Sequence, residues 1–273
     1  MLTDLRSILA LAEEKGCAIP AFNCYTQECV MGVLEAAKET GAPVIFQMFS
    51  RLADTNDGNF VAPAILEAIR QLPQPAVMHL DHGAGIPEVV RAIRLGMTGV
   101  MIDASTLPLE ENIAMTKLAA ELCSYAGVPV EGELGHVGAT KDEVLGNYTD
   151  VAEAERFVKE TGVSALAVMV GTAHGRYKKA PVLDIQRIRD IREATGKLPL
   201  VLHGGSGINN QCILDGIANG IAKINVGTEI RQTYERTLGE TNDVEKARAA
   251  VYTRTCEIIR SFRIEGNQEK LFG

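Results

Sequence analysis

The sequence predicts an α/β fold, namely a single TIM (β/α)8 barrel with a C-terminal helical extension. Short apolar runs alternate with segments of helical periodicity along the whole chain. Few polar residues interrupt these runs, which is typical of parallel strands buried on both faces. Eight such units follow at fairly even spacing, and 273 residues are enough for one barrel. Residues 1–273 are therefore expected to form one domain.

The apolar runs define the candidate strands. They are residues 18–23, 43–48, 76–81, 99–104, 129–135, 165–171, 198–205 and 222–228. A doubly wound sheet normally has a G-x-G-x-x-G turn after its first strand, and the corresponding stretch here, AIPAFNCYTQE, has none. A closed barrel is therefore favoured over a doubly wound sheet.

Helical patterns occupy the intervals between the runs. Residues 26–40 carry apolar side chains at helical spacing, with Thr26 as a candidate N-cap and Gly41 just beyond the end. Residues 209–219 show the same periodicity after an asparagine cap. Residues 241–273 follow the last strand, and we expect a helix and a tail there, which could cover the site or join an oligomer interface.

Composition excludes several classes of partner. The net charge of −8 and the absence of a basic run argue against nucleic acid, so an anionic substrate would need a local source of positive potential. No apolar run approaches the roughly 18–20 residues that span a membrane, and the first residues read as an amphipathic helix instead of a signal peptide. The six cysteines form no C-x-x-C pair and are expected to be reduced. We therefore expect a cytoplasmic protein.

Polar residues gather where the predicted strands end, which is where barrel enzymes place their active sites. They are Asp81 and His82, Asp103, Glu131, Glu133 and His136, His174, and His203. Four of the five histidines lie at or just beyond these ends, whereas His79 lies two residues inside the third run and is interpreted as structural. His82 should point away from the face that His79 and Asp81 share, or turn off the strand end. Imidazoles that converge from separate strands are a natural zinc site with an open position.

Two glycine-rich segments predict a phosphate site. Residues 203–207, HGGSG, follow the seventh run, and residues 225–228, NVGT, follow the eighth. Each leads into a predicted helix, whose first N–H groups can bind an anion, and glycine lets the backbone approach it closely. The loops after strands seven and eight commonly hold phosphate in barrel enzymes.

Ordered segments across most of the chain resemble one known family. AFN, HLDHG, MIDAS, E-x-ELG, GTAHG-x-Y, LVLHGGSGI and K-I-N-V-x-TE occur in this order. Together they resemble the class II ketose-bisphosphate aldolases, which include fructose-bisphosphate and tagatose-bisphosphate aldolases. The resemblance implies an aldehyde-lyase of carbohydrate metabolism that cleaves a phosphorylated ketose to dihydroxyacetone phosphate and an aldehyde through a zinc-stabilised enediolate. It also implies a homodimer or homotetramer.

The resemblance also implies roles for individual residues. His82, His174 and His203 would hold a catalytic Zn2+, Asp81 would protonate the aldehyde oxygen, and Asp103 and Glu133 match a second metal or monovalent-cation position. The expected substrate-binding residues are Gly175, Gly204, Gly205, Ser206, Asn225, Val226, Gly227 and Thr228, with Ser50 as a further candidate. A lysine Schiff base is not needed, and Lys223 is predicted at the wrong end of its strand for one.

One segment departs from the family pattern. The family continues with G-x-x-GG-x-E-D, whose glutamate moves the carbon-bound proton, but Lys141 takes that position here. We predict that Glu143, or else Asp142, serves as the base from a mobile loop. Lys141 also leaves open a non-catalytic or regulatory aldolase-like subunit.

Two questions remain open in the sequence. A zinc hydrolase on the same scaffold is disfavoured because AFNCY lacks the usual H-x-H pair of such barrels. The substrate is a ketose bisphosphate, a ketose 1-phosphate or a sugar-acid phosphate, and Arg176, Lys178 and Lys179 could meet a second anionic group.

Overall fold

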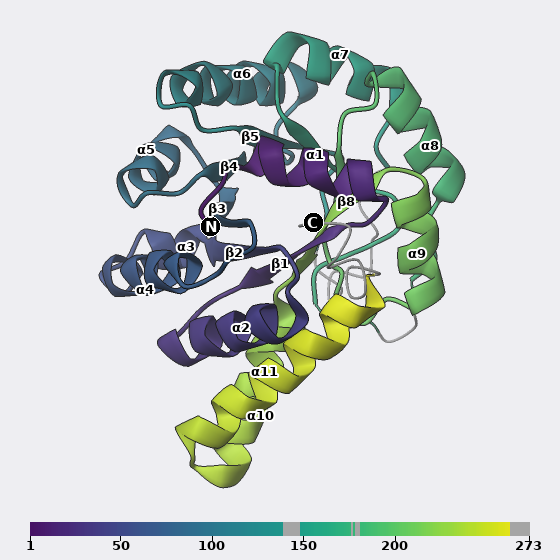
Figure 1. The fold of residues 1–273 in the computed structure, drawn as a ribbon. Coiled ribbons are helices and arrows are strands. Elements are labelled where there is room, and N and C mark those ends of the chain that lie inside the picture. Colours follow the sequence, from purple (N-terminus) through teal and green to yellow (C-terminus); the bar gives the residue numbers. More distant parts are fainter. Residues whose placement is uncertain (139–147, 176, 178–180, 263–273) are drawn as a thin grey trace.

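The computed structural model is a closed barrel of parallel strands in which each strand pairs with its neighbours in sequence, and the last pairs with the first (Figure 1). It describes residues 1–138, 148–175, 177 and 181–262. The strands are β1 (Ile19–Asn23), β2 (Val44–Phe49), β3 (Ala76–Gly83), β4 (Gly99–Ile102), β5 (Val130–Leu134), β6 (Ala165–Val168), β7 (Leu200–Leu202) and β8 (Ile221–Val226). The predicted TIM barrel is confirmed.

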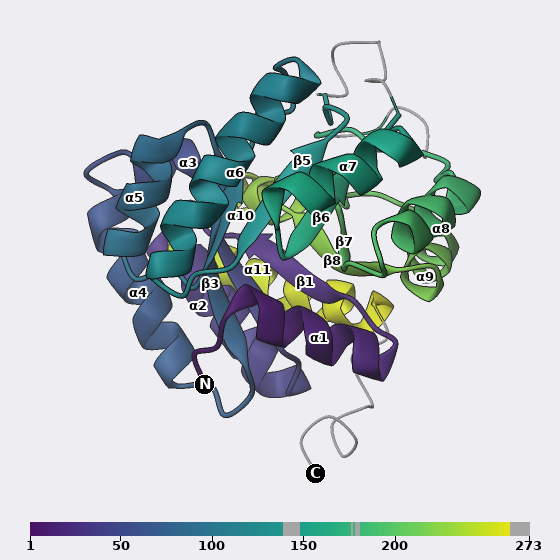
Figure 2. The ribbon, with the colours of Figure 1, turned by 90° about the horizontal axis from the view of Figure 1, so that it is seen from above.

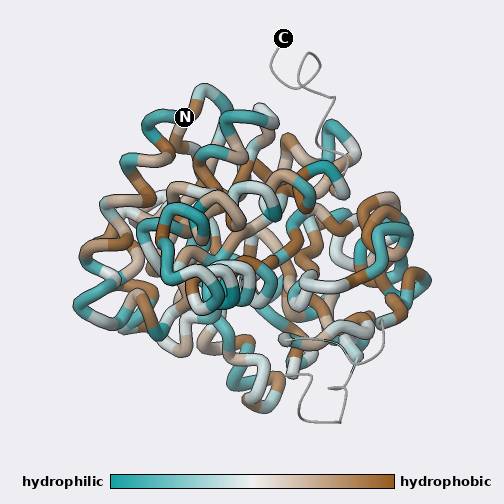
Figure 3. Tube along the Cα trace, turned by 90° about the horizontal axis from the view of Figure 1, so that it is seen from below, coloured by the Kyte–Doolittle hydropathy of each residue, from teal (hydrophilic) through white to brown (hydrophobic). Residues whose placement is uncertain are grey.

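Helices surround this barrel (Figure 1), and Figure 2 shows them on either side of the strands. They are α1 (Leu5–Lys15), α2 (Gln27–Thr40), α3 (Ser50–Ala53), α4 (Gly58–Arg70), α5 (Ile86–Arg94), α6 (Leu109–Tyr125), α7 (Val151–Thr161), α8 (Ile185–Ala194), α9 (Asn210–Ala218), α10 (Thr228–Thr241) and α11 (Val244–Ser261). Hydrophobic and hydrophilic stretches alternate along the chain in Figure 3, as expected for helices with one apolar side. None of the helices in the described ranges is long and apolar enough to cross a membrane.

Local sequence signals set the helix ends. The Thr26 side chain accepts a hydrogen bond from the Cys29 backbone N–H at the start of α2, and Gly41 ends that helix with a left-handed φ of 64°. Asn209 caps α9 in the same way. These caps confirm the predicted helix boundaries, because each satisfies backbone groups that a helix terminus leaves without partners.

The largest differences from the predicted strands are at β6 and β7. β6 ends at Val168 and β7 at Leu202, although their apolar runs continue to residues 171 and 205. Gly171 and Gly204 lie three and two residues beyond these ends, and their φ angles are 113° and 68°. Such φ angles end a strand, and glycine adopts them readily.

The ends of the barrel are not equivalent. α1 lies across the N-terminal ends of the strands, where the Leu5 N–H bonds to the Thr98 carbonyl just before β4. Leu5, Ile8 and Leu9 are fully or almost fully buried there. The C-terminal extension forms α11, which packs along α2, and a Cβ at Gly32 would lie 2.7 Å from Val251. With the N-terminal end closed, the opening to solvent is at the C-terminal ends of the strands.

The barrel interior holds a buried ion pair. The Lys223 ammonium lies 2.8 Å from Glu131 Oε2, and both side chains are fully buried. His79, which was expected to be structural, lies 3.5 Å from the same carboxylate oxygen. Burial and the charge of Lys223 lower the pKa of His79 well below its usual value, so this imidazole is neutral. Lys223 thus has a carboxylate partner inside the barrel.

Lys223→Met is expected to lower the free energy of unfolding by about 3–5 kcal/mol, because it leaves the Glu131 carboxylate buried without its cation. Urea unfolding of the metal-free protein measures this effect. Lys38→Met, which removes an exposed lysine bonded to Gln71, is the matched control and should change stability by less than about 0.5 kcal/mol. Equal stability of the Lys223 variant and the wild type would contradict the structural role of the pair.

Candidate active site

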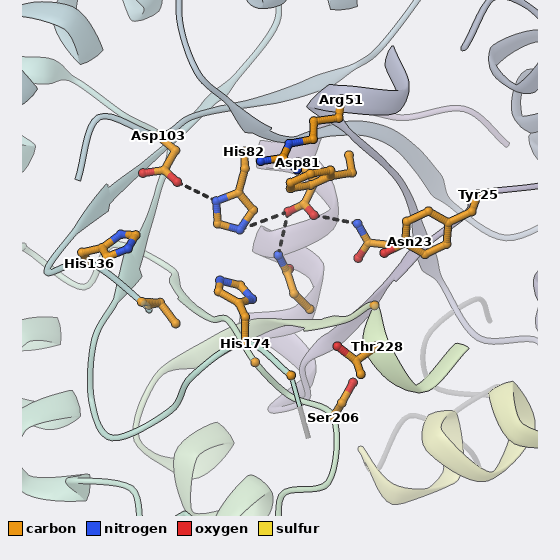
Figure 4. A pocket seen from close by; sticks show the side chains of 16 residues that line it. Asn23, Tyr25, Arg51, Asp81, His82, Asp103, His136, His174, Ser206 and Thr228 are labelled. Carbon is orange, nitrogen blue, oxygen red and sulfur yellow. Dashed lines mark hydrogen bonds and ion pairs between the residues drawn. The ribbon is translucent and has the colours of Figure 1, made fainter. Parts of the chain in front are cut away.

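A cavity of about 540 Å³ opens at the C-terminal ends of the strands. Residues that end or follow all eight strands line it, and Figure 4 shows them from close by. The protein is acidic overall, yet this cavity combines imidazoles and a guanidinium with its carboxylates. The arrangement is that of a barrel enzyme's active site.

Three histidines converge at this cavity. His82 lies one residue before the end of β3, and His174 and His203 follow β6 and β7. One ligand atom from each lies within 4.8 Å of the others. His82 Nε2 and His203 Nδ1 are 3.1 Å apart. The structure therefore brings together the three residues that the sequence resemblance assigned to one metal.

His82 reaches this position through an unusual backbone conformation. Its φ is 51°, in the left-handed region, and the pairing of β3 with β4 shifts register between Leu80 and Gly83. Successive strand residues normally point to opposite faces, but this turn brings both Asp81 and His82 to the cavity. His82 thus departs from the regular alternation within β3, and its side chain lines the same cavity as Asp81 instead of pointing to the opposite face.

Two carboxylates orient the imidazoles. Asp103 Oδ2 lies 2.7 Å from His82 Nδ1, and Glu131 Oε1 lies 3.0 Å from His203 Nε2. Each imidazole donates a ring N–H to its carboxylate. The other ring nitrogens, His82 Nε2 and His203 Nδ1, then face each other, and each has a lone pair. Two lone pairs at 3.1 Å need a cation between them, either a proton or a metal ion.

Electrostatics places that proton on His82 when no metal is bound. Burial lowers the pKa of His82, but Asp81 and the hydrogen bond to Asp103 outweigh it and raise the pKa to about 10. Burial and the charge of His82 lower the pKa of His203 well below its usual value. The site thus favours one positive charge among its histidines.

The donor set fits Zn2+. Three imidazoles with an open fourth position are a frequent catalytic zinc site. His174 Nε2 is buried and, among the described residues, has no hydrogen-bond partner. A second group, His82, Asp103 and Glu133, also lies within metal-binding reach. Burial and the nearby Asp103 raise the pKa of Glu133 to about 8, so a cation beside it would favour its ionised form.

Asp81 is held by two asparagines. The Asn23 amide donates to Oδ2 at 2.6 Å, and the Asn225 amide donates to Oδ1 at 3.1 Å. Burial raises the pKa of Asp81, but the positive charge of His82 beside it outweighs this effect, and the pKa is lowered. A fixed carboxylate beside the histidine cluster is well placed to exchange a proton with a bound molecule.

The loops after β7 and β8 form one wall of the cavity. Gly204 has a φ of 68°, and a Cβ there would lie 2.3 Å from a backbone oxygen of the loop after β6. α10 begins at Thr228 after Gly227 without a side-chain cap, and the Glu229 N–H donates to Ser206 Oγ. Backbone N–H groups at such a helix start favour an anion.

The predicted site residues fall into three groups. Those that line the cavity are Asp81, His82, Asp103, His174, Gly175, Gly204, Ser206, Asn225, Gly227 and Thr228. Those that do not are His203 and Glu133, which lie buried beneath it, and Ser50, Gly205 and Val226. Lys141, Asp142, Glu143, Arg176, Lys178 and Lys179 lie outside the described residues. The predicted base is thus not located.

Sequence reasoning assigned no role to several residues that matter here. Glu131 holds His203, Asn23 holds Asp81, and Arg51 lines the cavity. The available signal was a polar residue within an apolar run, as at Asn23 and Glu131. Arg51 gave no such signal because it follows the strand in an ordinary polar segment.

Comparisons with known proteins agree with this geometry. The family model described as fructose-bisphosphate aldolase class-II matches residues 3–267. A probable fructose-bisphosphate aldolase of Bacillus subtilis (strain 168) is 39% identical over 246 residues, 88% of this chain and 86% of that protein.

Two solved structures are similar over nearly the whole chain. The YdjI aldolase from Escherichia coli K12 has a TM-score of 0.89 and 35% identity, covering 98% of this chain and 100% of its own. A putative fructose-1,6-biphosphate aldolase from Coccidioides immitis has a TM-score of 0.91 and 26% identity, covering 97% and 98%. The chain therefore belongs to the class-II fructose-bisphosphate aldolase family and is an enzyme of the aldolase lyase type.

Proposed function

We propose that this enzyme reversibly cleaves a phosphorylated ketose, a bisphosphate or 1-phosphate, into dihydroxyacetone phosphate and an aldehyde, through an enediolate and with Zn2+. The carrying observation is the cluster of His82, His174 and His203 beside glycine-rich backbone in one cavity. A cavity of about 540 Å³ is in the range of small-ligand sites. The names of the relatives from Bacillus subtilis and Coccidioides immitis support a ketose phosphate as substrate.

The histidine cluster would hold the metal, which when bound supplies Lewis acidity to the ketone of the substrate. Asp103 and Glu131 keep His82 and His203 in the tautomers that direct their free nitrogens to it. Ser206, Thr228 and the N-terminus of α10 would bind the phosphate of dihydroxyacetone phosphate. The reacting carbons would then lie between the phosphate wall and the histidines.

Asp81 would transfer the proton at the aldehyde oxygen, protonating it in the addition direction and accepting the hydroxyl proton on cleavage. The bonds from Asn23 and Asn225 fix the direction in which its carboxylate faces. Glu143, or else Asp142, would remove and return the proton on carbon 3 of dihydroxyacetone phosphate.

Proton–deuterium exchange at carbon 3 of dihydroxyacetone phosphate in D2O tests this function without knowledge of the aldehyde. We expect the zinc-loaded enzyme to exchange this proton and a chelator to abolish the exchange. Exchange that is lost in Glu143→Ala but kept in Asp142→Ala would assign the base to Glu143. An absence of exchange from zinc-loaded protein would overturn the proposed reaction.

Glu131→Gln is expected to weaken zinc affinity by about 10- to 100-fold, because its neutral amide orients His203 less firmly than a carboxylate does. Competition with a chromogenic chelator measures the affinity directly. Glu67→Gln, on the exposed face of α4, is the control and should bind zinc as the wild type does. An unchanged affinity in Glu131→Gln would remove the orienting role of this carboxylate.

A further inference from the structure

Arg51 is a cation in the active-site cavity that the reaction described above does not use. It follows β2 directly, in the short helix α3, and its side chain is exposed and lines the cavity. Among the described residues, no hydrogen bond or ion pair to its guanidinium is found. Figure 4 shows this side chain directed into the cavity, across from Ser206 and Thr228.

The backbone that carries Arg51 is held in place. Its neighbour Ser50 is buried, and the Asp54 N–H bonds to the Ser50 carbonyl at 2.9 Å. Arg91 of α5 donates to the carbonyls of Ala53 and, at 3.1 Å, Thr55. The guanidinium therefore extends from a fixed base toward the cavity.

The carboxylates that line the cavity are hydrogen-bonded to groups other than this guanidinium. Asp81 is bonded to Asn23 and Asn225, and Asp103 is bonded to His82 and Ser105. An arginine that no carboxylate of the described residues neutralises is suited to bind an anionic ligand in a bidentate manner. In a protein of net charge −8, such a local cation is needed to attract an anion.

The order of groups across the cavity indicates which part of the substrate Arg51 meets. In Figure 4, Ser206 and Thr228 lie on one side, His82, His174 and Asp81 in the middle, and Arg51 on the other side. With the phosphate of dihydroxyacetone phosphate at the first side and the new bond beside Asp81, the remote end of the aldehyde extends toward Arg51.

We propose that Arg51 determines aldehyde specificity by binding an anionic group, phosphate or carboxylate, at the end of the aldehyde remote from the new bond. This inference rests on the proposed aldolase function. It selects acidic aldehydes over neutral ones of similar size. A charge-assisted hydrogen bond contributes about 1.5–3 kcal/mol, which corresponds to a preference of roughly 10- to 100-fold.

The test compares kcat/KM for addition of three aldehydes to dihydroxyacetone phosphate: glyceraldehyde 3-phosphate, succinic semialdehyde and neutral glyceraldehyde. Each value is normalised to carbon-3 proton exchange by the same protein. We expect the wild type to prefer one acidic aldehyde by at least about 10-fold and Arg51→Met to lose that preference. Arg51→Lys should restore part of it. Whether the phosphate or the carboxylate is preferred identifies the anion.

Arg70→Gln, on the outer surface of α4, is the matched control and should keep the wild-type preference. A wild type without a preference for acidic aldehydes, or a preference that survives in Arg51→Met, would overturn this inference while proton exchange upholds the aldolase function. A wild type without proton exchange would overturn both.

Discussion

His174→Ala is expected to lose both the bound metal and the aldolase activity. The substitution leaves two of the three imidazoles whose ligand atoms lie within 4.8 Å of one another. Residues that merely orient a ligand change metal affinity by about 10- to 100-fold, and loss of a direct ligand should exceed that range. We therefore expect less than about one hundredth of the wild-type turnover. Metal content after dialysis and the rate of ketose cleavage measure the two losses.

Substitution of a second histidine is the control that distinguishes loss of a metal ligand from a general effect of replacing a histidine in this cavity. His136 lines the same cavity and bonds to Ser105, but it is not part of the three-histidine group. His136→Ala should retain stoichiometric zinc. Stoichiometric zinc and full turnover in His174→Ala would remove the ligand assignment.

Asp81→Ala is expected to slow aldehyde addition and ketose cleavage by about 10²- to 10⁴-fold, the range for loss of a general acid–base group. Its zinc content should stay stoichiometric at saturating metal, because Asp81 lies 3.9 Å from His82 Nε2 and is not in the three-histidine group. Exchange of the carbon-3 proton should continue, since that step does not involve the aldehyde oxygen.

Measuring ketose cleavage and carbon-3 proton exchange in the same Asp81→Ala protein shows which half of the reaction is slowed. Slow cleavage with intact exchange assigns Asp81 to the aldehyde half of the reaction. Asp81→Ala with wild-type cleavage would show that another group transfers this proton. Loss of zinc from Asp81→Ala would instead indicate that the carboxylate supports the metal.

The fold could be predicted because its signals are local. Apolar runs, their spacing, and the caps at Thr26 and Asn209 are properties of short segments, and the structure reproduces the eight strands with shifts of a few residues at their ends. The histidine cluster followed from the fold, since the C-terminal strand ends of a barrel lie on one face. The largest errors were at β6 and β7, whose apolar runs continue beyond the last strand residue toward Gly171 and Gly204, where φ is positive.

The sequence by itself thus determined the barrel, the face that carries the site and many of the polar side chains that reach it. Tertiary structure alone decided which of them touch: Glu131 of β5 bonds to His203 after β7 and to Lys223 of β8, and the left-handed φ of His82 directs its ring. Such contacts join distant segments and depend on how the barrel closes and staggers its strands. Arg51 became a candidate for the same reason, because only its position across the cavity distinguishes it from an ordinary surface arginine.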